Sequence, residues 1–308
     1  MRNDAPRFSS RFTFLISALG IAVGTGNIWR FPRIVATNGG ENGAGSFLVA
    51  WIMFLLLWSI PLIIAEYVLG RQSRKGTVGA FAHFMGKPFA FLGGFVGFVS
   101  TAIAFYYSVI VGWNIYYFGS MTFNALPNTT ETSWEIWNNF QDGSFPILFH
   151  AIAMSVGGFA IYKGVSSIEK VNRILIPTLL AIVLLSVVRA LMLPGSMAGI
   201  TYLFTPDWSQ LKEPRIWLEA LTQNAWDTGA GWGLFLTYAI YIKKRYGVIK
   251  NAFTVAIGNN LVSLMAAIMI FSTVFSILGN EMGMAKPEIL DVMKSSGPAA
   301  TGLTFIWM

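Results

Sequence analysis

The chain has 308 residues, of which 55% are hydrophobic and only 11% are charged, and its mean hydropathy is +0.59. Soluble domains carry about a quarter charged residues, so this composition excludes an ordinary soluble globular protein. The absence of cysteine excludes disulfides and thiolate metal sites.

The net charge of +7 could suggest a nucleic-acid partner, but the distribution of the basic residues argues against one. Fourteen of the 21 lie in four short segments: Arg2, Arg7 and Arg11; Arg71, Arg74, Lys75 and Lys87; Lys163, Lys170 and Arg173; Lys243, Lys244, Arg245 and Lys250. The segments between them are acidic or mixed. This alternation follows the positive-inside rule and predicts a multi-pass protein of the inner (plasma) membrane with a cytoplasmic N-terminus. We therefore expect membrane lipid and no nucleic acid among its partners.

Apolar runs in register with this alternation predict seven membrane spans. They cover roughly 11–37, 44–70, 89–122, 145–162, 168–192, 215–242 and 248–278. A short amphipathic helix and the opening of another apolar run follow, which is the pattern expected of a truncated chain. We expect an all-α polytopic membrane protein in which 1–308 form a single transmembrane domain.

The first span is interrupted by the stretch "GIAVGTGNIWRFP" (20–32), which contains Gly20, Gly24 and Gly26. Glycine inside a helix costs about 1 kcal/mol relative to alanine, so this cluster predicts unwound backbone. Unwound backbone within a bilayer is tolerated only where it is buried in protein or lines a cavity.

The sixth span carries a similar interruption, "NAWDTGAGWG" (224–233), in which Asp227 stands beside Gly229, Gly231 and Gly233. Broken helices five spans apart are expected where a five-helix unit repeats in inverted orientation, and such pairs indicate a transport site. A carboxylate in a membrane span is costly, so Asp227 is predicted to be functional.

These motifs carry a family resemblance. "GIAVGTGNIWRFP" resembles the first-helix signature of the neurotransmitter:sodium symporters. "NGGENGAGSFL" (38–48), "IPLIIAEYVLGR" (60–71), "FYYSVIVGW" (105–113), "LFTPDWSQL" (203–211) and "SGPAATGLTFI" (296–306) follow in the family's order. The resemblance implies a leucine-transporter-like fold with inverted repeats and broken helices one and six. Of the family's twelve helices, the chain would contain one to seven and the outer loop that follows.

The resemblance also implies one or two sodium ions. One ion would be held by the Ala22 carbonyl, the side chains of Asn27 and Asn259, and the residue at position 227. A second would use the carbonyls of Gly20 and Val23 together with partners on family helix eight, which lies beyond this chain.

For the substrate, the resemblance implies a pocket between the two breaks. Its residues would be Ala22, Gly24, Thr25, Gly26, Tyr107, Trp226, Asp227, Gly229 and Trp232. Thr25 and Gly26 open a half-helix whose N-terminus favours a substrate carboxylate, and the Tyr107 hydroxyl would donate to the same group. Monoamine carriers have Asp at position 24, where this chain has Gly24 as amino-acid carriers do. Arg30 resembles the arginine of the outer gate.

Asp227 departs from the family, which usually has Ser or Thr there, and three hypotheses compete. It could ligate sodium, or its charge could replace the chloride of animal members, whose chloride site includes the residues that match Gln223 and Ser263. It could also pair with a cationic substrate or bind a proton. We favour the first two together, so chloride is not expected to be required.

We therefore predict a sodium-coupled symporter of a small organic solute, with an amino acid favoured, working by alternating access. The alternatives are a sodium-independent or proton-coupled amine carrier with Asp227 as the substrate's counter-ion, and a non-transporting membrane sensor or fragment. A homodimer is compatible with the pattern. An enzyme is not expected: Asp227-Thr228-Gly229 matches the aspartic protease motif, but that chemistry needs a second carboxylate and no second motif occurs.

Overall fold

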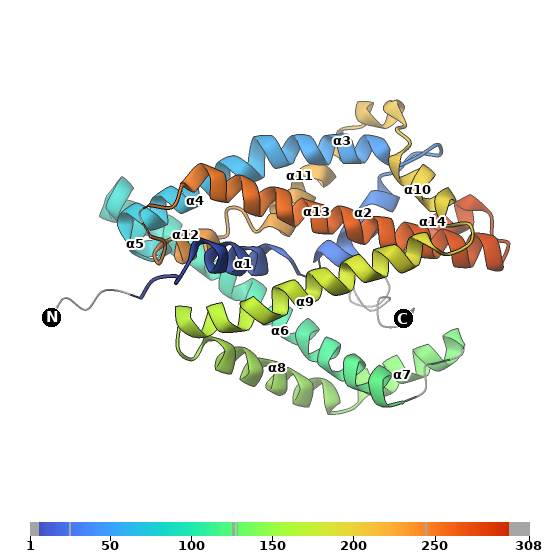
Figure 1. The fold of residues 1–308 in the computed structure, drawn as a ribbon, viewed down its shortest axis with the longest axis horizontal. Coiled ribbons are helices and arrows are strands. Elements are labelled where there is room, and N and C mark those ends of the chain that lie inside the picture. Colours follow the sequence, from blue (N-terminus) through green and yellow to red (C-terminus); the bar gives the residue numbers. More distant parts are fainter. Residues whose placement is uncertain (1–5, 25, 125–126, 128, 244, 296–308) are drawn as a thin grey trace.

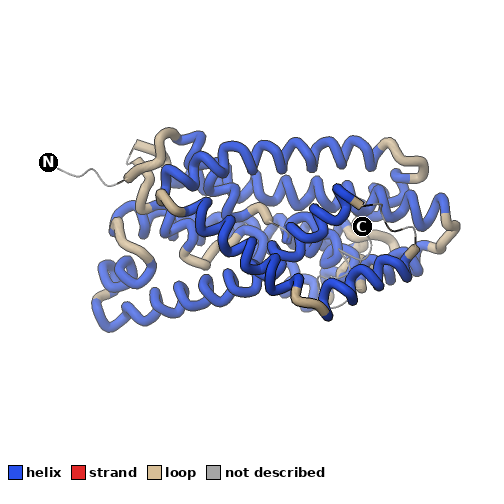
Figure 2. The backbone as a smooth tube through the Cα atoms, turned by 90° about the horizontal axis from the view of Figure 1, so that it is seen from below, coloured by secondary structure: helices blue, strands red, loops and turns tan. Residues whose placement is uncertain are grey.

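The computed structural model describes residues 6–24, 26–124, 127, 129–243 and 245–295. Over these ranges the chain is built from helices and loops without a strand, as Figure 2 shows. The prediction of an all-α protein is confirmed. The elements in chain order are α1 (Arg11–Ala22), η1 (Gly26–Arg30), α2 (Phe31–Thr37), α3 (Gly45–Phe54), η2 (Leu55–Ser59), α4 (Ile60–Ser73), α5 (Thr77–Met85), η3 (Lys87–Phe89), α6 (Ala90–Phe123), α7 (Thr130–Asp142), α8 (Phe145–Ile161), α9 (Val165–Leu191), α10 (Ser196–Phe204), η4 (Trp208–Lys212), α11 (Pro214–Thr228), α12 (Leu234–Ala239), α13 (Val248–Val274), η5 (Phe275–Glu281) and α14 (Lys286–Lys294).

Among the described residues, four continuous helical stretches are long and apolar enough to cross a membrane, and the number rises to six if each of two bent helix pairs counts as one span. Seven spans were predicted. The span expected over 215–242 is not among these helices because it is divided into α11 and α12. Neither half is long enough to cross a membrane alone. The predicted span 11–37 is one of the bent pairs, with an angle of 56° between its halves.

Burial separates the central helix from the peripheral ones. In the most apolar window of the stretch Val248–Glu281, 50% of the residues are buried, against 6% for Lys87–Phe123. Figure 1 agrees: α13 runs lengthwise through the middle of the bundle, while α6 lies with α7 and α8 in a layer at one side. The central position of α13 places its polar side chains within reach of both broken helices.

The second break is formed by backbone that only glycine adopts easily. Helix α11 ends at Thr228, and Gly229, Gly231 and Gly233 then have φ angles of +64°, +91° and +74°. This left-handed region is costly for residues with a Cβ atom, so the three glycines permit the interruption before α12 begins.

The N-terminal segment is held against α9 at the end of the bundle expected to face the cytoplasm. One oxygen of Glu169, Oε1, accepts hydrogen bonds from the Ser9 amide (2.7 Å), the Ser9 hydroxyl (3.0 Å) and the Thr13 hydroxyl (2.5 Å). Lys243 donates to the Ser9 carbonyl at 2.7 Å. The segment before α1 is therefore part of the packed structure.

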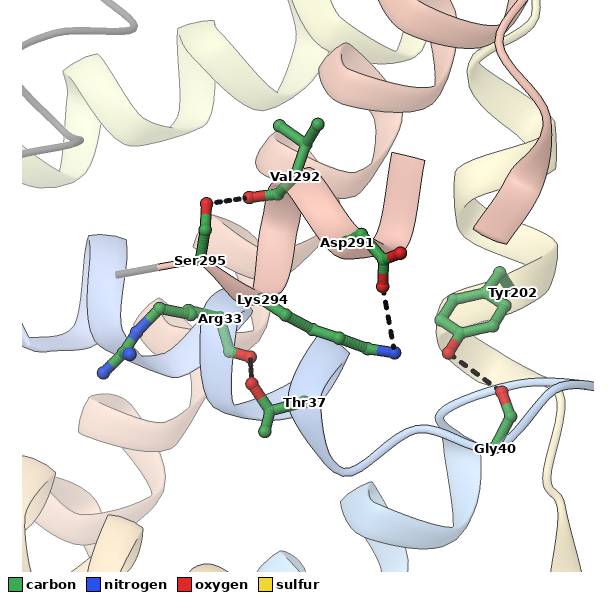
Figure 3. Close-up of polar contacts among 8 residues, drawn as sticks. All are labelled: Arg33, Thr37, Gly40, Tyr202, Asp291, Val292, Lys294 and Ser295. Carbon is green, nitrogen blue, oxygen red and sulfur yellow. Dashed lines mark hydrogen bonds and ion pairs between the residues drawn. The ribbon is translucent and has the colours of Figure 1, made fainter. Parts of the chain in front are cut away.

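The opposite end is closed by loops and by α14, which packs beside α2. Figure 3 shows the contacts there: Tyr202 on α10 donates to the Gly40 carbonyl at 3.0 Å, and Thr37 donates to the Arg33 carbonyl at 2.9 Å. Lys294 and Asp291 form an ion pair of 3.9 Å within α14. These contacts fix the outer end of the first broken helix.

The two helix breaks as a candidate functional site

The breaks in the first and sixth spans face each other. A Cβ atom added to Gly26 would lie 3.2 Å from the Trp226 ring and 3.3 Å from Oδ1 of Asp227. Glycine at position 26 thus allows the start of η1 to approach the end of α11 closely. Two segments separated by about two hundred residues therefore lie side by side, and their joint function as a binding site stays a prediction.

Three of the predicted sodium ligands lie together at this point. One terminal atom of the Asn259 amide lies 3.2 Å from the Ala22 carbonyl oxygen and 3.3 Å from the Asp227 carbonyl oxygen. Both carbonyls belong to residues at helix ends, where the carbonyls of the last turn have no intrahelical partner. Carbonyl and amide oxygens at such breaks form the donor set that suits Na⁺.

Asn27 lies in the same cluster, but its side-chain nitrogen, and not its oxygen, faces Asn259 and Ser263. Its Nδ2 donates to Asn259 Oδ1 and to Ser263 Oγ, both at 2.8 Å, while its Oδ1 accepts the Gly24 amide at 2.7 Å. In this orientation the Asn27 oxygen is occupied by the backbone. Its direct role as a sodium ligand stays a prediction.

The Asp227 side chain is buried, with 3% of its surface exposed, and is surrounded by polar groups from three elements. Its Oδ2 accepts a hydrogen bond from Ser263 on α13 at 3.2 Å. The Gln223 side chain and the Arg30 guanidinium also lie near enough to interact with the carboxylate. The Asp227 carboxyl group is therefore surrounded by Ser263, Gln223 and Arg30, which come from α13, α11 and η1.

Aromatic rings form one wall of the site. Tyr107 on α6 stacks on Trp226 with ring centroids 6.3 Å apart, and Trp226 meets Trp232 edge-on at 5.5 Å. A Cβ on Gly24 would lie 4.0 Å from Tyr107, and one on Gly229 would approach nothing closer than 3.9 Å. The two glycines leave room between the breaks where larger residues would fill it.

Arg30 lies on the outer side of this wall. Its guanidinium carbon is 5.6 Å from the centroid of the Trp226 ring, and its Nη1 donates to Gln223 Oε1. The arginine is thus linked to α11 through one ring and one amide. Its function as a gate stays a prediction, and Thr25 lies outside the described residues.

Two of the ligands predicted for the second sodium ion, Gly20 and Val23, are among the described residues. Gly20 packs on α9, where an added Cβ would lie 3.0 Å from Asn172 Oδ1 and 3.2 Å from Ile176. The backbone of Val23 continues from the end of α1, its amide donating to the Leu19 carbonyl at 2.7 Å. Both stay predicted ligands.

Glu66 on α4 braces the second break from below. Its Oε1 accepts the Gly231 amide at 2.6 Å and its Oε2 accepts the Leu236 amide at 3.0 Å. Ser100 on α6 donates to the Trp232 carbonyl at 2.5 Å. Backbone groups freed by the glycines are therefore satisfied by side chains of neighbouring helices.

Comparison with known proteins decides the family. The model of the Sodium:neurotransmitter symporter family matches residues 5–143 and 145–308. The chain belongs to this family. Its members are transporters of the membrane and not enzymes, and the leucine-transporter-like fold is confirmed by the crystal structure of MhsT in complex with L-phenylalanine. That structure matches with a TM-score of 0.77 and 29% identity, covering 98% of this chain and 69% of MhsT.

Among curated relatives, an uncharacterized sodium-dependent transporter of Methanocaldococcus jannaschii is 33% identical over 86% of this chain. The human sodium-dependent neutral amino acid transporter SLC6A17 is 29% identical over 87% of it. The chain spans 55% of the first relative's length and 41% of the second's.

Two polar residues of the site were missed by the sequence reasoning. Asn224 and Asn260 are buried, with 0% and 5% of their surfaces exposed, beside the predicted ligands. The available signal was an amide within a long apolar span, since such a group must find a hydrogen-bond partner. Asn224 lies in the last turns of α11, four residues before its end at Thr228, and Asn260 directly follows Asn259.

Proposed function

We propose that this chain is the larger part of the core of a sodium-coupled symporter for an amino acid, working by alternating access. The observation that carries the proposal is the convergence of the Ala22 carbonyl, the Asp227 carbonyl and the Asn259 amide where the two breaks meet. A cation held there joins both broken helices, so its binding can favour one arrangement of these helices over another.

The aromatic wall beside this cluster supports an amino acid with an apolar or aromatic side chain. Tyr107, Trp226 and Trp232 present aromatic surface, and the start of η1 offers a half-helix N-terminus for a carboxylate. Gly24 leaves open the position where an aspartate would repel that carboxylate. MhsT, which shares the fold, was crystallised with L-phenylalanine.

Chloride is not needed in the proposed mechanism. Asp227 lies beside Ser263 and Gln223, so its carboxylate, when ionised, supplies a negative charge in the neighbourhood where a bound anion would otherwise balance the sodium. This arrangement supports charge compensation by the protein itself. The proposal places the N-terminus in the cytoplasm, in agreement with the basic segments.

The test is thermal stability of the purified protein at full length, screened against amino acids and amines in sodium and in matched potassium. A ligand that binds only the folded state raises the unfolding midpoint by mass action. We expect an amino acid to stabilise the protein in sodium, without chloride, and not in potassium. An amine lacking a carboxylate that stabilises equally in potassium would overturn the proposal and make Asp227 the substrate's counter-ion.

A further inference from the structure

Four asparagines from three segments form a continuous row of hydrogen bonds through the middle of the protein. Asn27 donates to Asn259 at 2.8 Å, Asn259 to Asn260 at 3.2 Å, and Asn260 to Asn224 at 3.4 Å. We refer to Asn27, Asn259, Asn260 and Asn224 as the amide row. Each is at most 5% exposed, so water does not replace these bonds.

One end of the amide row is fixed by backbone carbonyls. Asn224 Nδ2 donates to the Trp51 carbonyl at 2.7 Å and to the Ala220 carbonyl at 3.2 Å. A carbonyl can only accept, so the nitrogen of Asn224 must face these two groups and its oxygen must face Asn260. Asn260 must then turn its nitrogen to Asn224 and its oxygen to Asn259.

The other end is fixed by a backbone amide. Gly24 N–H can only donate, and it lies 2.7 Å from Asn27 Oδ1. The Asn27 nitrogen must therefore face Asn259 and Ser263. Both ends impose the same direction on Asn259, whose nitrogen faces Asn260 and whose oxygen faces Asn27.

This direction has a consequence for the two carbonyls at the breaks. If the Asn259 amide were reversed, its nitrogen would satisfy the carbonyls of Ala22 and Asp227 at 3.2 and 3.3 Å. The reversed nitrogen would then face the donor of Asn27 at 2.8 Å, and the reversed oxygen would face Asn260 Oδ1 at 3.2 Å. The amide row therefore disfavours the reversed Asn259 amide at both of its neighbours. In the orientation that remains, the Asn259 side-chain oxygen lies close to the carbonyl oxygens of Ala22 and Asp227, and a bound cation would offset the repulsion among these three oxygens.

We propose that Asn224 and Asn260 are positioning residues that hold the Asn259 amide with its oxygen toward the cation site, so that the site is organised before sodium arrives. The inference rests on the proposed function. It assigns to Asn224 and Asn260 an effect on sodium affinity, although their hydrogen bonds run to protein groups and not to the carbonyls at the breaks. Without them, Asn259 could turn its nitrogen to the two carbonyls and satisfy the site without an ion.

The test measures the apparent sodium affinity of the full-length protein, from the rise of its unfolding midpoint with sodium concentration, for Asn224→Leu and Asn260→Leu. Losing one hydrogen bond of average strength from the organised state corresponds to about a fivefold weaker affinity. The unfolding midpoint without sodium should fall less than the midpoint in saturating sodium, because the freed amide can satisfy the empty site. A merely structural role would lower both midpoints alike.

Two further variants make the result specific. Ser59→Ala is the matched control. The Ser59 hydroxyl is buried on η2 and contacts Thr228 Oγ1 at 3.1 Å and the Asn224 backbone carbonyl at 3.5 Å. It makes no hydrogen bond to the side-chain amides of the amide row. Asn224→Asp in its protonated form keeps a donor facing the Trp51 carbonyl and an oxygen facing Asn260. This variant should retain sodium affinity within about threefold, which is less than one average hydrogen bond.

The outcomes separate this inference from the proposed function. Sodium affinity that weakens in both leucine variants, but not in Ser59→Ala or Asn224→Asp, supports the amide row. Leucine variants that bind sodium like Ser59→Ala would overturn it and leave the symporter proposal intact. An unaltered protein that sodium does not stabilise at all would overturn both.

Discussion

Ser263 on α13 donates a hydrogen bond to the Asp227 carboxylate across 3.2 Å, while the same hydroxyl accepts one from Asn27 across 2.8 Å. The charged group of the sixth span is thereby connected to the break in the first span through a single side chain of the central helix. A change in the charge at Asp227 must therefore be felt at the cation site.

Replacing Asp227 with Ser should make the protein depend on chloride. The variant removes the fixed charge and leaves Ser263 and Gln223 beside a new hydroxyl, which together offer an anion several donors. Sodium-dependent amino-acid binding should fall about tenfold or more in gluconate, the loss of one charge-assisted interaction, and recover in chloride. Binding by Asp227→Ser that is equally strong in both salts would contradict charge compensation. Asp142→Ser, at the end of α7, is the control.

Replacing Gly24 with Asp should reverse the preference between an amino acid and its decarboxylated amine. Among the described residues, a Cβ at position 24 would meet only Tyr107, at 4.0 Å, so the first atom of the new side chain is accommodated. The charge of the aspartate would repel a substrate carboxylate and attract an ammonium group. Thermal shift with phenylalanine and with phenethylamine measures the change. Gly24→Ser adds similar bulk without charge, and an equal loss in both variants would show that size alone matters.

Replacing Glu66 with Gln should destabilise the break in the sixth span. The carboxylate accepts two backbone amides, from Gly231 and Leu236, whereas glutamine has only one accepting oxygen. Losing a hydrogen bond to a charged group costs about 1.5–3 kcal/mol, which should lower the unfolding midpoint and weaken substrate binding together. Glu41→Gln, on the exposed outer loop, is the control and should change neither the unfolding midpoint nor substrate binding. A Glu66→Gln protein as stable as that control would show that the hydrogen bonds from Gly231 and Leu236 to Glu66 are dispensable.

A glycine pair tests the packing of α12 against α4. A Cβ on Gly70 would lie 2.0 Å from the Leu236 carbonyl oxygen, so Gly70→Ala must separate the two helices and should cost about 1–3 kcal/mol. Gly94→Ala on α6 meets nothing within 4 Å among the described residues and should be neutral or stabilising. Denaturation in detergent compares them, and equal midpoints would disprove the close contact.

The outline of the fold could be predicted because its signals are local. The glycine clusters at 20–26 and 229–233 lie at the two helix breaks, although Gly20 itself belongs to α1 and Gly26 to η1, and the alternation of basic segments orders the spans. The interruption between α11 and α12 is predictable for the same reason. Three glycines within five residues disfavour a continuous helix, and in the structure all three have positive φ angles.

The amide row could not be predicted because it depends on distance in space. Nothing in the sequence places Asn224 beside Asn260, 36 residues apart, or shows that Asn27 turns its nitrogen toward Asn259. The π-helical segment η2 within the second span was also missed, since a wider helical turn has no compositional signature in "LLLWS". Orientation of a side chain is decided by its neighbours, and these come from other helices.

Glu169 receives its three hydrogen bonds from Ser9 and Thr13 on a single oxygen. Because Glu169 belongs to α9, any movement that carries α1 and the segment before it away from α9 must break all three bonds together. A movement elsewhere in the bundle leaves them intact. One carboxylate therefore works as a latch that resists displacement of the N-terminal segment and of no other part of the protein.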